Sequence, residues 1–316
     1  MLSGVSSYGS STESLAQSIN EYLYENGRRY HTYFGVDKYV IPTDDTERDR
    51  LDINHEVLLH QLDGELHGAP MKNPKRILDV GTGTGIWAID MAEKHPYAEV
   101  LGIDLSPTQP SWVPPNCRFE VDDADDDWVH ASDSFDFIHL RNLNQGIQDW
   151  GHVMSEAYRC VKPGGYIELS EAGHAFFSDD NSMAPTSAPA IYSQKLHEGM
   201  CLLRRKPVQE VGELEKRLRD AGVVDIQAFT LKQVFGPWAK DLRMKKIGVL
   251  NWAQAETAFH AYGMAAFTRA LGMTAGDADR LCRETDAATR DKNIHLYTKQ
   301  YVCRRLGGGR GGWAEN

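Results

Sequence analysis

The chain has 316 residues, enough for one substantial core with an accessory layer, and its apolar content of 41% and charged content of 25% are ordinary for a globular protein. A net charge of −11 disfavours direct nucleic-acid binding, and no apolar run approaches the roughly 18 residues of a membrane span. Five scattered cysteines without a CxxC pair indicate a reducing compartment, cytoplasmic and/or nuclear, and no structural zinc.

The N-terminal part of the chain precedes any recognisable motif. Residues 1–14 are rich in serine and glycine, and we expect them to be disordered. Apolar residues at helical spacing predict one helix over residues 11–26 and another over residues 44–66. A nucleotide-binding sheet does not need these residues to close. We therefore interpret residues 15–70 as a helical cap over the ligand.

A strand, a glycine-rich turn and a helix come next. Residues 77–80 form an apolar run, Gly81, Gly83 and Gly85 follow, and residues 86–94 have helical spacing. In this order they form the first unit of a doubly wound α/β sheet. The glycines allow a tight turn and let a ligand approach bare backbone.

Other ligands are bound by similar turns. Dinucleotide sites have the spacing GxGxxG, whereas this chain has GxGxG with Asp79 two residues before the first glycine. A phosphate-binding P-loop is excluded, because no Gly-Lys-Ser/Thr follows. The pattern resembles motif I of class I S-adenosylmethionine (SAM) methyltransferases. Such a loop needs a carboxylate for an ammonium group and no lysine for phosphate.

Acidic residues follow the next two predicted strands. Asp104 ends residues 99–104 and lies about 20 residues after the glycines, where a carboxylate can reach a ribose. The alternative role of Asp104 is to cap the following turn. Residues 118–121 predict a third strand, which runs into five aspartates within residues 122–128. An acidic run is usually a solvated loop; a metal site is a further alternative, although no partner cluster stands elsewhere in the chain.

The fourth and fifth predicted strands are residues 134–140 and 166–171, with a helix over residues 148–161 and a turn at residues 162–165 between them. Arg141 follows the fourth strand, where cofactor or acceptor meets an open α/β sheet. His139 within that strand is either a core histidine or a base.

The later segments alternate insertions with returns to the core. The core occupies residues 71–175, followed by an insertion near the substrate at 176–208, a core return at 209–238, a helical lid at 239–291, the last strand at 292–305 and a flexible tail at 306–316. Within them we predict helices over residues 190–204, 211–221, 242–263, 265–271 and 275–288, and strands over residues 224–235 and 295–304.

Several motifs together resemble the fungal LaeA-like methyltransferases of secondary metabolism and development, over roughly residues 28–305. Motif I is common to all class I methyltransferases, whereas the other motifs are narrower. They include Tyr30-His31, Tyr39, Glu47-Arg48-Asp49-Arg50-Leu51 with His55, Ser106-Pro107 with Gln109-Pro110, Trp112-Val113-Pro114-Pro115-Asn116, Trp128 and Phe135 to Arg141.

The resemblance implies a Rossmann-like sheet of seven strands, in the order 3-2-1-4-5-7-6 with the last strand antiparallel, and SAM as cofactor. It also implies that adenine is read at Asp123 and Ala124, with Asp122 as the alternative to Asp123. The cofactor-binding set that we expect comprises Tyr39, Arg48, Asp79, Gly81, Thr82, Gly83, Gly85, Asp104, Leu105, Asp122, Asp123, Ala124 and Arg141. The candidates for a base are His139, His174 and Glu171.

The acceptor cannot be read from any motif. We expect methyl transfer to an oxygen or nitrogen atom, on a small metabolite. The alternatives are a regulator that acts through protein substrates or velvet-type partners, and a SAM-binding fold that does not methylate.

Overall fold

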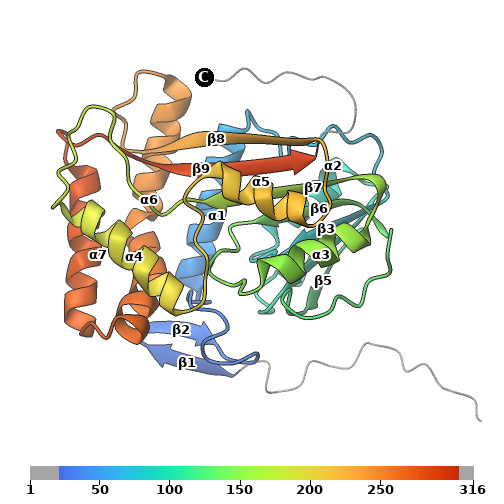
Figure 1. The fold of residues 1–316 in the computed structure, drawn as a ribbon, viewed down its shortest axis with the longest axis horizontal. Helices are drawn as coiled ribbons and strands as arrows, with labels where there is room; N and C mark the ends of the chain where they lie inside the picture. Colours follow the sequence, from blue (N-terminus) through green and yellow to red (C-terminus); the bar gives the residue numbers. More distant parts are fainter. Residues whose placement is uncertain (1–20, 306–316) are drawn as a thin grey trace, which may run out of the picture.

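A computed structural model describes residues 21–305 of the chain (Figure 1). The expectations for residues 1–14, for the first part of the helix over residues 11–26 and for the tail at 306–316 lie outside the described residues. No helix within residues 21–305 has both the length and the apolar content to cross a lipid bilayer.

A seven-stranded mixed sheet forms the centre of the fold, in the order β5-β4-β3-β6-β7-β9-β8. Strands β3, β4, β5, β6 and β7 run parallel, and β9 is antiparallel to both of its neighbours. In core numbering this is the order 3-2-1-4-5-7-6, so the predicted topology is confirmed. The strands are β3 (Arg76–Val80), β4 (Glu99–Asp104), β5 (Cys117–Val121), β6 (Phe135–Arg141), β7 (Val161–Ala172), β8 (Ile226–Phe235) and β9 (Leu296–Arg305).

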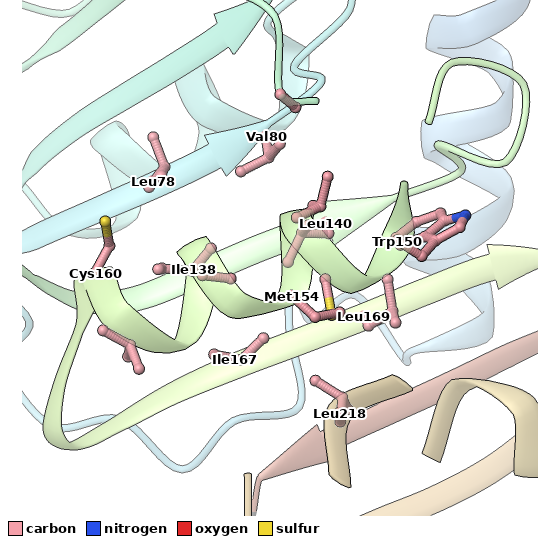
Figure 2. Packing of buried hydrophobic residues seen from close by; sticks show 14 of the residues in the cluster. Leu78, Val80, Ile138, Leu140, Trp150, Met154, Cys160, Ile167, Leu169 and Leu218 are labelled. Atoms are coloured by element: carbon pink, nitrogen blue, oxygen red, sulfur yellow. The ribbon is translucent and has the colours of Figure 1, made fainter. Parts of the chain in front are cut away.

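Helices cover both faces of the sheet because its central strands are apolar on both sides. On one face, Leu78, Ile138 and Leu169 are buried against α3 (Trp150–Cys160), which Figure 2 shows from close by. On the other face, Ile77 and Phe137 pack against α2 (Ile86–Lys94). Side chains alternate along a strand, so Asp79 shares the α2 face with Ile77.

The cap and the lid form a helical layer beside the sheet, at the left of Figure 1. Helix α1 (Asp45–Gln61) packs along the long helix α6 (Leu242–Ala265), which also contacts β8. Around α6 lie α4 (Ala188–Leu202), the π-helical turn η2 (Ala266–Ala270) and α7 (Ala275–Arg290), whose apolar side chains share a second core. Helix α5 (Val211–Asp220) packs against β8 and β9.

Two sequence predictions were wrong in detail. The end of the helix over residues 11–26 is instead a hairpin, β1 (Tyr22–Glu25) and β2 (Arg28–His31), because Asn26 and Gly27 both adopt positive φ in its turn. The turn at residues 162–165 is an irregularity within the continuous strand β7, where the register with β6 shifts. The helices predicted over residues 242–263 and 265–271 correspond to α6 and η2, which follow one another without a gap.

Candidate active site

A cavity of about 950 Å³, including its open mouth, lies at the carboxyl ends of the central parallel strands, where ligands bind in open α/β sheets. Most residues expected to bind the cofactor line it. They are Tyr39, Asp79, Gly81, Thr82, Gly83, Asp104, Leu105, Asp122, Asp123, Ala124 and Arg141, together with His139. We call this space the cofactor cavity.

The glycine loop between β3 and α2 forms one wall of the cofactor cavity. Gly81, Gly83 and Gly85 all have φ between 59° and 82°, a region that other residues rarely adopt. A Cβ on Gly85 would lie 2.5 Å from the ring of Phe119, so this glycine is required for packing and does not line the cavity. A Cβ on Gly83 would lie no closer than 3.6 Å to any side chain, that of Leu51, and Gly83 therefore offers bare backbone.

Asp79 holds the loop and His139 together. Its two carboxylate oxygens accept hydrogen bonds from Thr82 Oγ1 at 2.6 Å and from His139 Nδ1 at 2.8 Å. The imidazole of His139 stacks on Trp87, with ring centroids 3.8 Å apart, and is buried. Burial lowers the pKa of His139. Because a carboxylate only accepts, the Nδ1 atom of His139 carries a proton, and this histidine is anchored within the wall.

Asp104 lies at the end of β4 and faces the cavity. One oxygen accepts the N–H of Gly83 at 2.8 Å and the other accepts the N–H of Ser106 at 3.0 Å. Burial raises the pKa of Asp104 to about 6. Each carboxylate oxygen keeps a lone pair for a ligand hydroxyl, so the residue can bind a ribose.

The acidic stretch after β5 forms the opposite wall. Asp123 is buried and pairs with Lys38 Nζ at 2.6 Å, and the same ammonium group lies 2.9 Å from Asp125. Asp122 accepts only the N–H of Asp123 among the hydrogen bonds found, and burial raises its pKa. Asp122 therefore has more free acceptor capacity for an amine than Asp123. The sequence did not indicate that Lys38 is the partner of this stretch.

Arg141 is the last residue of β6, and its guanidinium begins a chain of hydrogen bonds that the sequence did not reveal. Its guanidinium donates to His55 Nδ1 at 3.1 Å, and His55 Nε2 lies 2.9 Å from a carboxylate oxygen of Asp90. Since arginine only donates, Nδ1 of His55 is the acceptor and Nε2 donates to Asp90. Thr84, in the glycine loop, donates to Asp52 of α1 at 2.6 Å, so α1 is attached directly to this loop.

Besides Gly85, three expected site residues lie outside the cofactor cavity. Arg48 is 41% exposed at its side chain and pairs with Asp45 on the surface of α1. Glu171 is fully buried and accepts the N–H groups of Leu143 and Asn144 at 2.8 and 3.1 Å, which fixes the loop after β6. Burial raises the pKa of Glu171 to about 7.

The third of these residues, His174, lines a second cavity of about 580 Å³, including its open mouth, which we call the acceptor cavity after the role proposed for it below. Asn54 of α1 lines both cavities, so the two adjoin there. Its other walls come from α1, α4, α6 and the ends of β7, β8 and β9. They comprise Arg50, Ala172, Gly173, Phe176, Tyr192, Leu196, Gln233, Phe235, Asn251, Gln254, Ala255, Ala258, Phe259, Tyr262 and Thr298.

Residues 21–305 contain no group of three or more histidine, cysteine, aspartate or glutamate side chains placed to hold a metal ion. Of the aspartates after β5, Asp123 and Asp125 pair with Lys38, and Asp125 also accepts the backbone N–H groups of Gln148 and Asp149.

Comparison with known proteins identifies the family. Residues 53–227 match the family model described as a methyltransferase domain. The methyltransferase pytC of Aspergillus terreus is 38% identical over 84% of this chain and 82% of its own length. The secondary metabolism regulator LAE1 of Cochliobolus heterostrophus is 38% identical over 72% of this chain and 76% of its own length. The protein-methionine methyltransferase laeA of Emericella nidulans is 30% identical over 90% of this chain and 76% of its own length. The chain belongs to the LaeA-like methyltransferase family.

The cofactor of this LaeA-like methyltransferase is SAM, and the residues present fit it. Gly83 provides backbone without a side chain, Asp104 provides an acceptor for hydroxyl groups, and Asp122 provides an acceptor for an amine. Among the lining residues, all within the described part of the chain, Arg141 is the only arginine or lysine, which suits a ligand without phosphate. When bound, SAM supplies a methyl group that its sulfonium has already activated; the protein contributes alignment and exclusion of water.

Proposed function

We propose that this LaeA-like methyltransferase methylates a small molecule that binds in the acceptor cavity. The observation that supports this proposal is the position of Asn54, which lines both cavities and so places a second hollow beside the cofactor cavity. Its walls are mostly apolar and aromatic with a few polar groups, which is the usual lining of a small-molecule site.

The cap and the lid support the same proposal. The acceptor cavity lies beneath α6 and α4, which together with α1 cover the end of the sheet. Such a cover excludes water from the transfer and orients the acceptor. A hollow lined from three helices and three strand ends can surround a small molecule on several sides, which favours such an acceptor over a folded protein surface.

The test is methyl transfer from isotopically labelled SAM in a fungal extract separated into metabolites and proteins. Label in the metabolite fraction, lost in the variant Asn54→Leu, supports the proposal. Label found only in protein, including this chain itself, would refute it. SAM binding by Asn54→Leu, measured by calorimetry, serves as the control that the variant folds and keeps its cofactor cavity.

A second proposal is that the chain regulates secondary metabolism or development through a protein substrate or velvet-type partners in the cytoplasm and/or nucleus. The names of its relatives support it, since one is a regulator and another a protein-methionine methyltransferase. The five unpaired cysteines are consistent with a reducing compartment. Affinity capture from a fungal nuclear extract tests it, and recovery of no velvet-type protein would count against it.

A further inference from the structure

We propose that the acceptor is an uncharged aromatic compound with a hydroxyl group, and that His174 Nε2 accepts the proton of that hydroxyl. The proposal rests on the proposed function, because it names the kind of small molecule that the acceptor cavity takes. Three features of the cavity carry it: its aromatic wall, its charge balance and the position of His174.

The wall is built from rings that contact one another. Phe176 lies 5.3 Å from Phe235 and 5.8 Å from Phe259, between ring centroids, and Tyr192 lies 5.4 Å from Phe259. The hydroxyl of Tyr192 donates to the carbonyl of Phe259 at 2.9 Å, so this tyrosine offers mainly its ring. Aromatic faces and edges arranged in this way favour a planar ring as ligand.

The positive charge of Arg50, which lines the acceptor cavity, is already paired within the protein. Arg50 is buried, donates to Glu47 at 2.7 and 2.9 Å and also donates to Gln254. Its guanidinium lies over the ring of Tyr262, 5.1 Å from the centroid. No aspartate or glutamate is among the lining residues, all of which lie within the described ranges. A charged acceptor would therefore lose its hydration without gaining a counterion, which is costly.

The amide side chains of the cavity are largely engaged with the protein. Gln233 donates to Gln61 at 3.0 Å, and Asn251 donates to the carbonyl of Val234 at 2.9 Å. Gln254 donates to Asn251 at 3.0 Å. Gln233, Asn251 and Gln254 are therefore already engaged, whereas the Nε2 atom of His174 is a buried polar atom without a hydrogen-bond partner within residues 21–305.

His174 follows Gly173 after the end of β7, beside the ring of Tyr262 at 5.3 Å. Its Nε2 atom is buried and has no hydrogen-bond partner within residues 21–305. Burial lowers the pKa of His174 to about 4. The imidazole is therefore neutral near pH 7, and the tautomer protonated at Nδ1 leaves a lone pair on Nε2 for a hydroxyl donor.

The transfer step balances with these groups. The acceptor oxygen forms a bond to the methyl carbon while the carbon–sulfur bond breaks, and sulfur keeps that electron pair. The hydroxyl proton passes to His174 Nε2, which releases it to solvent when the products leave. The products are a methyl ether and S-adenosylhomocysteine, and no oxidant or reductant is needed.

The test compares the binding of naphthalene probes by calorimetry, with S-adenosylhomocysteine saturating the cofactor cavity. We expect 2-naphthol to bind at least about tenfold more tightly than 2-naphthoate or the 2-(aminomethyl)naphthalene cation. In His174→Phe, 2-naphthol should lose about three- to tenfold in affinity, the range of one hydrogen bond, while 2-methoxynaphthalene should lose nothing. His174→Gln, which can still accept a hydrogen bond, should keep 2-naphthol binding but should not support methyl transfer to a phenolic acceptor.

The possible outcomes distinguish a failure of the proposed acceptor class or of the role of His174 from a failure of the proposed function. Equal losses for naphthol and its methyl ether in His174→Phe would refute the role of His174, provided that the variant binds S-adenosylhomocysteine as the wild type does. Tighter binding of either charged probe would refute the acceptor class and leave a small-molecule acceptor standing. Failure of every naphthalene to bind, with label from SAM appearing only in protein, would overturn the proposed function itself.

Discussion

The sharpest test of the cofactor cavity is the substitution Gly83→Ala. Gly83 has φ +59°, and an added Cβ would lie 3.6 Å from its nearest neighbour, Leu51 Cδ1. The new methyl group would therefore cause no clash in the free protein and would occupy only the space of the cavity. Its cost in the absence of ligand is the left-handed backbone conformation, about 1–2 kcal/mol.

Gly272 provides a matched control. It has φ +65°, and a Cβ added there would meet nothing within 4 Å. Gly272→Ala should therefore lower the free energy of unfolding by the same 1–2 kcal/mol or so, far from the cofactor. Gly85→Ala is the opposite case, because its Cβ would lie 2.5 Å from Phe119 and should destabilise the fold further.

We expect Gly83→Ala and Gly272→Ala to unfold at similar urea concentrations but to differ in SAM affinity. A methyl group forced into the space of a bound ligand costs about 1–3 kcal/mol, which raises the dissociation constant by roughly 5- to 150-fold. Calorimetric titration with SAM measures this difference directly. Wild-type affinity in Gly83→Ala, or an equal loss in Gly272→Ala, would refute the inference that SAM lies against the backbone of Gly83.

Three further variants probe individual charges. Because burial raises the pKa of Asp104 to about 6, the SAM affinity of the wild type should weaken as the pH falls through 6. Asp104→Asn should bind SAM roughly tenfold more weakly and show no such inflection, and calorimetry at several pH values measures both effects. Burial raises the pKa of Glu171 from 4.5 to about 7, so the folded state holds this proton more tightly and loses stability as the pH rises from 4.5 to 7. The difference in free energy of unfolding between Glu171→Gln and wild type should therefore change by about 3 kcal/mol in favour of the variant over this pH interval, as measured by urea denaturation. Lys38→Met should cost about 2 kcal/mol of stability by leaving Asp123 and Asp125 unpaired, again by urea denaturation.

Each charge variant has its own control. An inflection near pH 6 that persists in Asp104→Asn would assign it to another group. A constant stability difference between Glu171→Gln and wild type would show that Glu171 does not titrate in this range. The double variant Lys38→Met with Asp125→Asn should recover part of the loss, and a purely additive loss would contradict the ion pair.

The sheet was predictable from the sequence because its signals are local. A glycine turn, an apolar run and an acid at a strand end each lie within a few residues, and β4 and α2 have the predicted bounds. The order 3-2-1-4-5-7-6 came from the family resemblance and from no local pattern. The first hairpin was missed because its strands are short and the spacing of Tyr22 and Leu23 also suits a helix.

The site was predictable only where each residue belongs to one local motif. The cofactor-cavity residues on the glycine loop and at the strand ends can each be found from a short pattern of neighbouring residues. Lys38 and Asp123 are 85 positions apart, and Arg141 and His55 are 86 apart, so no pattern could pair them. Arg48 was expected at the site because of its motif, but its place on α1 turns it toward solvent, where it pairs with Asp45.

The two cavities are built from different parts of the chain, and this difference affects how each can vary within the family. The cofactor cavity depends on strand ends whose geometry any sheet of this type reproduces. The acceptor cavity draws side chains from Arg50 to Thr298, contributed by three helices and three strand ends. Substitutions in the cap or lid can reshape it without disturbing β3, β4 or the glycine loop. The lining of the acceptor cavity can therefore differ among relatives at 30–38% identity while the glycine loop stays the same, and a substitution of Asn54, which lines both cavities, should affect both.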